Sequence, residues 1–316
     1  GEAWDNTALE QTNPDMKRMM ETCAGVTWMK LCSQILRLTG DPSTVDEIEK
    51  YIYNGLTGAM KPTGDGFSYV NLLNGVKTNT NGWGGVVNGV DVTCCNLNGP
   101  MGLAYIPFVA VMNAKEGPVI NLYNAGMATV TTPANQKLLL DIVTDFPLSG
   151  AVKIGVKPQS AEKFSIRLRI PSWSKETTLR VNGVKQMVTP GAYKEITRIW
   201  SAGDKIELIL DMRCRLMDAP HGSNRKGDNY QALVRGPVVL SRDENIDSNF
   251  NKPVMIPSKG GYVEAIPESP ALPNTKMQFR IRTDKGFIHM VDYASVNSWN
   301  GKRICTWLPK KVYTLR

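Results

Sequence analysis

The chain has 316 residues, a formal net charge of +8 at pH 7 and a sequence pI near 9.1. Its length predicts two or three domains with ample buried apolar surface. The six cysteines are too few for a disulfide scaffold. The basic residues are dispersed among acidic ones, and no apolar run approaches the roughly 20 residues of a membrane-spanning helix. The sequence therefore argues against a disulfide-stapled domain, a nucleic-acid-binding protein and a helical membrane protein.

The first third of the chain carries helical patterns. Apolar residues at helical spacing predict a helix over 22–38, which the Gly-Asp-Pro sequence at 40–42 ends. A second helix is predicted over 44–55, so that the two form an αα-hairpin. The Gly- and Asn-rich stretch 62–93 predicts short strands or loops. The segment "NGPMGLAYIPFVAVM", residues 98–112, predicts one more helix that bends or ends near its second proline.

After about residue 115 the pattern changes to alternation of apolar and polar residues. The segments "KFSIRLRI" (163–170) and "KIELILDM" (205–212) place their apolar residues on one face, which is typical of antiparallel β-strands in a sandwich. A polar stretch, "HGSNRKGDN" (221–229), then precedes another β-rich segment. We predict a multidomain chain of mixed α and β structure. Its parts are a helical segment over 1–114, a first β-sandwich over 115–220 and a second β-sandwich over 221–316.

Two short motifs bring metal-binding side chains into the helical part. Cys94 and Cys95 are adjacent, and Glu21 and Cys23 stand two apart at the start of the first helix. Residues two apart point about 200° away from each other inside a helix, so this pair can face one point only at or before the first turn. Three thiols and one carboxylate suit tetrahedral zinc in type and number. Separate buried thiols are the alternative at this stage.

The remaining cysteines lie in apolar patterns and are predicted to be buried thiols. They are Cys32, Cys214 and Cys305.

An ordered set of short motifs resembles a known family. The strings "ETCAG", "YNG", "FSYVN" and "TCCNLN" occur in the helical part, and "LRIPSW", "RVNG", "AGDKIELIL" and "RGPVVL" follow in the β part. In this order, and with the rare Cys-Cys pair, they resemble glycoside hydrolase family 127, the β-L-arabinofuranosidases and their relatives. The resemblance covers nearly the whole chain. It implies the C-terminal part of an (α/α)-barrel catalytic domain followed by two β-sandwich domains.

The resemblance also implies a metal centre. Its ligands on this chain would be Glu21, Cys23, Cys94 and Cys95, holding Zn²⁺. Cys94 matches the nucleophile of a retaining mechanism in which a thiolate replaces the usual carboxylate. Zinc suits this role because it keeps a thiol deprotonated near neutral pH.

Three further residues match functional positions of the family. Glu2, in "GEAW", matches the acid/base residue, a role that requires a pKa raised toward neutrality by burial. Glu49 and Tyr69 match positions that contact the sugar. The alternatives are a solvated helix carboxylate for Glu49 and a packed strand aromatic for Tyr69.

The sequence departs from the family at several positions. Leu72 stands where the family often has proline, and "CCNLN" replaces the more frequent "CCPPN", which indicates a divergent subfamily. The front half of the barrel, with the family's substrate-binding histidines, is expected to lie outside this chain. His221 and His289 match no motif and are predicted to be structural or surface residues. Trp83 could stack on a sugar ring or pack against the barrel.

These features predict a retaining glycoside hydrolase that acts on L-arabinofuranosides or related sugars of plant glycans. The expected partners are a carbohydrate substrate and either the missing N-terminal half or a second copy of the chain, and the isolated chain is expected to be inactive. A periplasmic or extracellular location is favoured. One alternative is a carbohydrate-binding or structural protein with a structural zinc site. Another is a zinc-water hydrolase of amides, which would need an open metal position.

Overall fold

The computed structural model describes residues 21–69, 71–76, 85–87, 90–219, 229–296 and 301–311. Within these residues the chain is mainly β, with few helices and several sheets, as expected for a multidomain mixed fold. Its described residues form two compact units. Unit 1 draws on the described residues within Gly1–Lys30, Lys50–Leu103 and Arg213–Arg316, and unit 2 on Leu31–Glu49 and Ala104–Met212. The predicted division into three domains in chain order stays a prediction.

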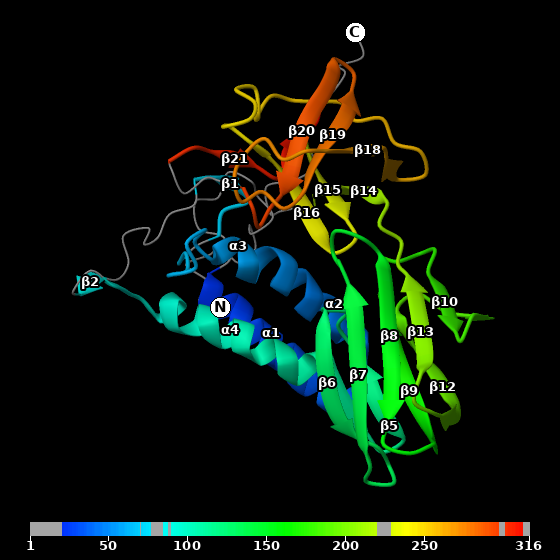
Figure 1. Cartoon of the computed structure of the whole chain (residues 1–316). Helices are drawn as coiled ribbons and strands as arrows, with labels where there is room; N and C mark the ends of the chain where they lie inside the picture. The colour runs from blue at the N-terminus through cyan, green and yellow to red at the C-terminus, as the bar shows by residue number, and fades with distance from the viewer. Residues whose placement is uncertain are drawn as a thin grey trace. The chain divides into compact units, whose positions relative to one another are not determined.

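The helices lie in the first third of the described chain (Figure 1). They are α1 (Thr22–Thr39), α2 (Ser43–Lys50), the π-helical turn η2 (Tyr51–Leu56), α3 (Thr57–Ala59) and α4 (Cys94–Ala110). Gly40 ends α1 with a φ of +70°, a conformation that glycine adopts without strain. An Asp41 carboxylate oxygen accepts a hydrogen bond from the Ser43 N–H at 2.9 Å and thereby caps the start of α2.

The last helix differs from the sequence prediction at both ends. It begins at Cys94 rather than Asn98, and it continues past Pro107 to Ala110. Thr93 explains the early start, because its hydroxyl oxygen accepts a hydrogen bond from the Asn96 N–H at 3.2 Å, as an N-cap does. Both adjacent cysteines therefore lie in the first turn of a helix. Among the described helices, none combines the length and hydropathy that spanning a membrane requires.

Unit 2 contains two sheets with alternating burial. The six-stranded sheet has the order β11-β10-β13-β8-β7-β6, and the four-stranded sheet has the order β12-β9-β5-β4. The strands are β4 (Val111–Ala114), β5 (Gly117–Ile120), β6 (Gly126–Thr131), β7 (Lys137–Thr144), β8 (Ala151–Pro158), β9 (Glu162–Ile170), β10 (Thr178–Val181), β11 (Val184–Gln186), β12 (Ala192–Trp200) and β13 (Asp204–Ile209). Figure 1 shows β6, β7, β8 and β13 in one layer and β5, β9 and β12 in a second layer.

The burial pattern explains this sandwich. Phe164, Ile166, Leu168 and Ile170 of β9 are all buried, as are Ile206 and Leu208 of β13. Side chains two apart share one face of a strand, so the apolar face of each sheet points into the core. The predicted antiparallel pairing is confirmed for β13 with β8 and β10, whereas β9 pairs antiparallel with β12 and parallel with β5.

Unit 1 contains a ten-stranded sheet whose main path has the order β17-β14-β15-β16-β20-β19-β18. The strands of this path are β14 (Cys214–Asp218), β15 (Tyr230–Arg235), β16 (Val238–Asp243), β17 (Tyr262–Val263), β18 (Ala265–Glu268), β19 (Gln278–Thr283) and β20 (Gly286–Asp292). Three short strands join it, namely β1 (Asn74–Gly75), β21 (Ile304–Cys305) and β22 (Leu308–Pro309), and β2 (Gly85–Val87) pairs separately with β3 (Val90–Val92).

The isolated cysteines and the described histidine lie as predicted. Cys32, Cys214 and Cys305 are buried and form no disulfide. His289 lies on β20 at the surface, with its Nδ1 2.7 Å from a carboxylate oxygen of Glu268. His221 lies outside the described residues.

Candidate metal centre

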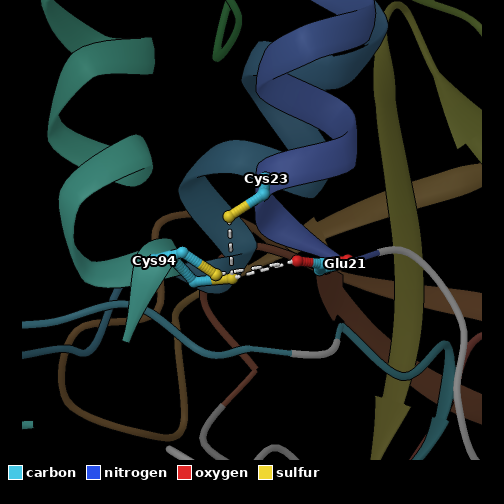
Figure 2. A group of neighbouring side chains, drawn as sticks. Glu21, Cys23 and Cys94 are labelled. Atoms are coloured by element: carbon cyan, nitrogen blue, oxygen red, sulfur yellow. Dashed lines mark hydrogen bonds between the residues drawn. The ribbon is translucent and has the colours of Figure 1, made fainter. Parts of the chain in front are cut away.

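The structure brings Glu21, Cys23, Cys94 and Cys95 together (Figure 2). Their candidate ligand atoms all lie within 4.8 Å of one another. Glu21 directly precedes α1 and Cys23 lies in its first turn, which is the placement that lets residues two apart face one point. Cys94 and Cys95 open α4. The sequence places the two motifs about seventy residues apart, and the fold joins the starts of two helices.

The distances fit one small cation. Cys23 Sγ lies 3.3 Å from Cys95 Sγ, and the sulfurs of Cys94 and Cys95 each lie 3.9 Å from an oxygen of Glu21. Around a tetrahedral zinc with Zn–S bonds of roughly 2.3 Å, two sulfurs lie roughly 3.8 Å apart. Cys23, Cys94 and Cys95 form no disulfide, so a disulfide does not account for the close approach.

The start of α1 is fixed by hydrogen bonds around Thr22, which is fully buried. Its hydroxyl donates to the Ser68 carbonyl at 2.6 Å, and its N–H donates to the Tyr69 carbonyl at 3.1 Å. The Tyr51 hydroxyl donates to the Thr22 carbonyl at 3.0 Å. These bonds fix the backbone between Glu21 and Cys23, so both ligands are held at the same turn.

Gly25 makes the approach of Tyr51 possible. A Cβ at this position would lie 2.0 Å from Cε2 of the Tyr51 ring, far inside van der Waals contact. Only a residue without a side chain therefore lets Tyr51 reach the carbonyl of Thr22. This gives a physical reason for the glycine in "ETCAG".

The start of α4 is fixed separately. The Asn96 carboxamide oxygen accepts a hydrogen bond from the Phe67 N–H at 2.6 Å, which ties the helix to the preceding loop. Gly99 allows this loop to approach, because a Cβ there would lie 2.3 Å from the Phe67 ring. The first turn of a helix presents unpaired N–H groups and a positive dipole end, so the start of α4 is a suitable place for negatively charged metal ligands.

The cluster concentrates acidic groups that need a compensating cation. Burial raises the pKa of Cys95 to about 11, and burial followed by hydrogen bonding to Cys94 and Cys95 raises the pKa of Cys23 further above its ordinary value. Glu21 is buried, and its Oε2 has no hydrogen-bond partner within the described part of the chain. A buried carboxylate oxygen beside three thiols is the donor set expected of a zinc site, so these residues fit the metal.

The three sulfurs differ in exposure. Cys95 is fully buried, Cys23 is partly buried, and Cys94 is exposed. Tyr69 packs beside Cys95 and is itself buried, and its carbonyl lies 3.8 Å from Cys95 Sγ. An incoming molecule can therefore reach the sulfur of Cys94 most readily. The assignment of Tyr69 as a sugar contact stays a prediction.

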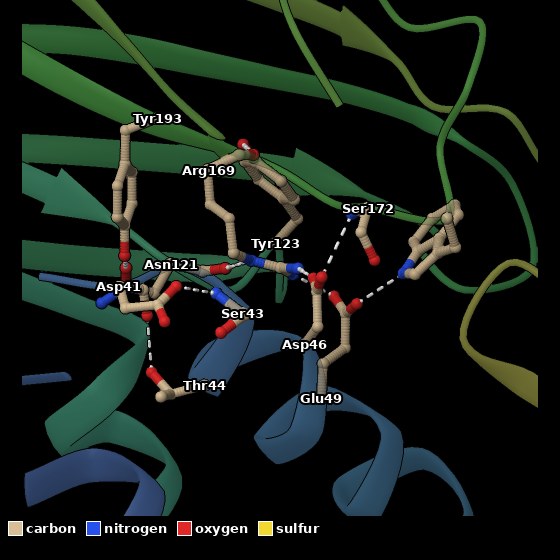
Figure 3. Close-up of polar contacts among 11 residues, drawn as sticks. Asp41, Ser43, Thr44, Asp46, Glu49, Asn121, Tyr123, Arg169, Ser172 and Tyr193 are labelled. Atoms are coloured by element: carbon tan, nitrogen blue, oxygen red, sulfur yellow. Dashed lines mark hydrogen bonds and ion pairs between the residues drawn. The ribbon is translucent and has the colours of Figure 1, made fainter. Parts of the chain in front are cut away.

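Glu49 lies in unit 2, in a buried polar network between α2 and β9 (Figure 3). One carboxylate oxygen accepts a hydrogen bond from Arg169 at 2.5 Å, and the other accepts one from the Trp173 indole N–H at 2.8 Å. Glu49 and Arg169 are both fully buried. Burial raises the pKa of Glu49, whereas the guanidinium and the indole N–H favour its charged form.

The same arginine holds a second carboxylate. Arg169 Nη1 lies 2.5 Å from an oxygen of Asp46, and Arg169 Nε donates to the Asn121 carbonyl at 2.7 Å. Both carboxylate oxygens of Glu49 are thus engaged within unit 2, and its predicted contact with a sugar stays a prediction. The local sequence pattern did not indicate this network, although Arg169 occupies the polar face of the predicted strand "KFSIRLRI".

Sequence reasoning also missed Asn98. Its side-chain N–H group lies 3.3 Å from Cys23 Sγ and 3.1 Å from the Cys94 carbonyl. The available signal was its spacing, because a residue four positions after Cys94 on a helix lies on the same face. Two predicted positions, Glu2 and Trp83, lie outside the described residues.

Comparison with known families gives two matches along the chain. A family model described as the catalytic domain of β-L-arabinofuranosidase, GH127, matches residues 4–107. A model described as the GH127 middle domain matches residues 119–212. The first range contains all four residues of the metal cluster, and the second contains most of the β-sandwich of unit 2.

Individual relatives agree with these matches. The non-reducing end β-L-arabinofuranosidase of Bifidobacterium longum is 27% identical over 240 residues, which cover 71% of this chain and 35% of the relative. A solved GH127 β-L-arabinofuranosidase from Geobacillus stearothermophilus T6 is 21% identical, with a TM-score of 0.76 over 92% of this chain and 50% of its own. A solved structure described as a glycoside hydrolase is 24% identical, with a TM-score of 0.75 over 92% of this chain and 52% of its own.

At these identities the solved structures establish the similarity of fold. The chain spans about a third of the length of the curated relative and about half of the length of the solved structures.

Proposed function

The chain belongs to glycoside hydrolase family 127, and from that premise we propose that it carries the metal centre and nucleophile of a retaining glycoside hydrolase. The proposed substrates are L-arabinofuranosides, or related sugars, of plant glycans. The observation that supports the proposal most is the convergence of one carboxylate and three thiols, with one thiol, that of Cys94, exposed.

Cys94 is the proposed nucleophile. Its sulfur forms a bond to the anomeric carbon while the glycosidic C–O bond breaks and a carboxylic acid protonates the leaving oxygen. Water then attacks the same carbon, the carboxylate accepts the proton of that water, and the C–S bond breaks. Two displacements at one carbon retain its configuration. Glu2 is proposed for the acid/base role on its match to the family motif.

The other residues of the cluster hold the metal. Glu21, Cys23 and Cys95 would bind zinc together with Cys94, and the bound ion would supply the positive charge that keeps Cys94 deprotonated near neutral pH. The buried positions of Glu21 and Cys95 suit ligands that stay in place during the reaction. Soft thiolates with one carboxylate favour zinc over calcium or magnesium, which prefer oxygen ligands.

The helical part is proposed to be a portion of an (α/α)-barrel. Apolar side chains on α1 and α4 are exposed in this chain, including Trp28 at 47% and Leu97 at 74%. We propose that residues present in the longer relatives cover such faces and supply the sugar-binding histidines. A second copy of the chain is the alternative partner for these faces.

Labelling of the nucleophile tests this function. A mechanism-based β-L-arabinofuranoside probe is applied to the chain alone and to a polypeptide extended to the length of the relatives. The expected result is an adduct on Cys94 of the extended form, mapped by peptide mass spectrometry and absent in Cys94→Ser. Cys32→Ser is the matched control, because that thiol is buried and outside the cluster. An adduct on a carboxylate instead would refute the thiolate mechanism.

A structural zinc site is the second candidate function, favoured by the four protein ligands. It predicts bound metal and no adduct on Cys94 in either polypeptide. The zinc-water hydrolase is disfavoured by the same count, because four protein ligands leave no open position for water on a tetrahedral ion.

A further inference from the structure

Asn98 lies one helical turn after Cys94 and connects the two motifs of the metal cluster. Its side-chain nitrogen lies 3.3 Å from Cys23 Sγ at the start of α1 and 3.1 Å from the carbonyl of Cys94 at the start of α4. The amide has two N–H groups, so it can donate to both atoms at once. Neither Cys23 nor Asn98 is fully exposed, and the contact is therefore partly sheltered from water.

A hydrogen bond of this kind has a specific effect on a thiolate. The sulfur accepts the bond through a lone pair, so an N–H donor favours the charged form that binds metal. It also fixes the direction of the remaining lone pairs. Groups that bond to metal ligands in this way hold the ligands in orientation, and their loss commonly lowers metal affinity by about 10- to 100-fold.

The other sulfurs of the cluster have different surroundings. Cys95 Sγ faces the Tyr69 carbonyl at 3.8 Å and is fully buried, whereas Cys94 is exposed and its Sγ lies 3.9 Å from Glu21. Cys23 is partly buried and packs against the buried pair Tyr69 and Cys95. Cys23 Sγ has a side-chain amide as its donor, that of Asn98, whereas Cys95 is bonded by a backbone group of Cys23.

We propose that Asn98 is a positioning residue of the metal centre, which donates an N–H hydrogen bond to Cys23 and holds that sulfur as a permanent ligand. This inference rests on the proposed metal site. The contacts distinguish the roles of the two cysteines. The Cys23 sulfur is bonded by an amide from the facing helix, whereas the Cys94 sulfur is exposed and accessible to the substrate. The second asparagine of "CCNLN", Asn98, is therefore assigned to the orientation of Cys23.

A purely structural role for Asn98 makes a different prediction. The bond to the Cys94 carbonyl joins residues four apart in one helix, and its loss would lower stability whether or not metal is bound. Asn96 provides the matched comparison. It lies in the same turn and its side chain bonds the Phe67 N–H, which is a backbone group of the neighbouring loop.

The experiment measures the metal centre directly. The 316-residue chain and its variants Asn98→Ala, Asn98→Asp and Asn96→Ala are loaded with Co²⁺, and thiolate-to-cobalt charge-transfer absorption is recorded. Zinc affinity is measured by competition with a coloured chelator. We expect both Asn98 variants to lower zinc affinity by about 10- to 100-fold and to change the cobalt absorption. Asn96→Ala removes a bond that holds the start of α4 but no bond to a sulfur, so it is expected to lower zinc affinity by less than either Asn98 variant and to leave the position of the cobalt absorption unchanged.

Asn98→Asp keeps the shape of the side chain but replaces its N–H donor by an ionised carboxylate, which repels the thiolate form of Cys23. Melting temperatures of each variant with and without zinc control for folding. Loss of a ligand-positioning contact reduces the increment that zinc adds, whereas a structural defect lowers both temperatures equally.

Two results would overturn the inference. Unchanged zinc affinity and cobalt absorption in both Asn98 variants would show that Asn98 does not position Cys23. The proposed metal site would be unaffected by that result. Absence of charge-transfer absorption from the cobalt-loaded unaltered chain would refute the proposed metal site. It would therefore also refute the role of Asn98.

Discussion

Cys23 Sγ and Cys95 Sγ lie 3.3 Å apart although 72 positions separate them in the sequence. Each sulfur stands at the start of a different helix, and each helix start is fixed by its own hydrogen bonds, through Thr22 for α1 and Asn96 for α4. The cluster is therefore held by its scaffold before any metal arrives. Preformed sites lose less conformational entropy on binding than flexible ones do.

The first prediction concerns metal content and its dependence on pH. We expect about one zinc per chain at neutral pH, because four ligands make one tetrahedral site. Without metal the pKa of Cys95 is raised to about 11 and that of Cys23 is also raised, so zinc must displace protons from these thiols. Affinity therefore rises with pH and falls on acidification.

Equilibrium dialysis followed by elemental analysis checks the metal prediction. Zinc is expected to be lost progressively from neutral to mildly acidic buffer and regained when the buffer is neutralised. Cys305→Ser is the control, because that buried thiol lies outside the cluster. A zinc content that does not change across this range would contradict thiolate ligation.

The second prediction distinguishes the proposed nucleophile from its neighbours. Cys94→Ser is expected to abolish turnover of an aryl arabinofuranoside by the polypeptide extended to the length of the relatives, because a serine hydroxyl is not ionised near neutral pH. The circular dichroism spectrum is expected to stay unchanged. Turnover at the rate of the unaltered enzyme would exclude Cys94 from the mechanism.

The third prediction concerns the buried ion pairs of unit 2. Arg169→Met is expected to destabilise the chain by about 3–5 kcal/mol, because it leaves the fully buried Glu49 and its neighbour Asp46 without their cation. Urea unfolding measures the change. If Arg169→Met unfolds at the same urea concentration as the unaltered chain, the network contributes nothing to stability.

Arg167→Met is the matched control for the ion pairs. Arg167 lies two positions away on the same strand and pairs with Glu116 and Glu195, but its side chain is 34% exposed and its partners more so. Such pairs contribute about 0–1 kcal/mol. The difference between the two variants therefore isolates the effect of burial.

The fourth prediction concerns Gly25. Gly25→Ala would place a Cβ 2.0 Å from the Tyr51 ring and displace the hydroxyl that bonds the Thr22 carbonyl. We expect a loss of about 1–3 kcal/mol in stability together with weaker zinc binding, since Thr22 precedes Cys23. Gly155→Ala is the control, because the nearest atom to its Cβ would lie 3.6 Å away, an ordinary contact. Equal effects of both substitutions on zinc affinity would contradict this account.

The parts of the fold that depend on local pattern were predictable from the sequence. Alternation located β9 and β13, and the geometry of residues two apart correctly restricted Glu21 and Cys23 to positions at or before the first turn of α1. Contacts between distant segments were not predictable in this way. The pairing of Glu49 with Arg169 joins residues 120 positions apart, and nothing in either local pattern specifies the other partner.

The start of α4 shows a second limit of prediction from the sequence. The apolar run suggested a helix beginning near Asn98, whereas the cap at Thr93 adds the first turn, which carries both cysteines. That extra turn also places Asn98 within reach of Cys23. A cap is a single hydrogen bond that the periodicity of apolar residues does not reveal, so the sequence pattern did not indicate that Asn98 lies beside Cys23.

The last prediction is that this chain alone hydrolyses arabinofuranosides at no useful rate, although it carries the proposed nucleophile. It spans about half of the length of the solved relatives, and Trp28, Leu97 and Phe108 expose 47%, 74% and 74% of their surfaces. A sugar must be positioned and shielded from water on all sides for rapid displacement, and these effects account for several kcal/mol of a catalytic barrier. Exposed apolar faces also favour self-association, which light scattering would detect. The assay compares the 316-residue chain with the polypeptide extended to the length of the relatives on the same aryl furanoside. Comparable turnover from the two would show that this chain holds a complete active site and would contradict the need for additional residues.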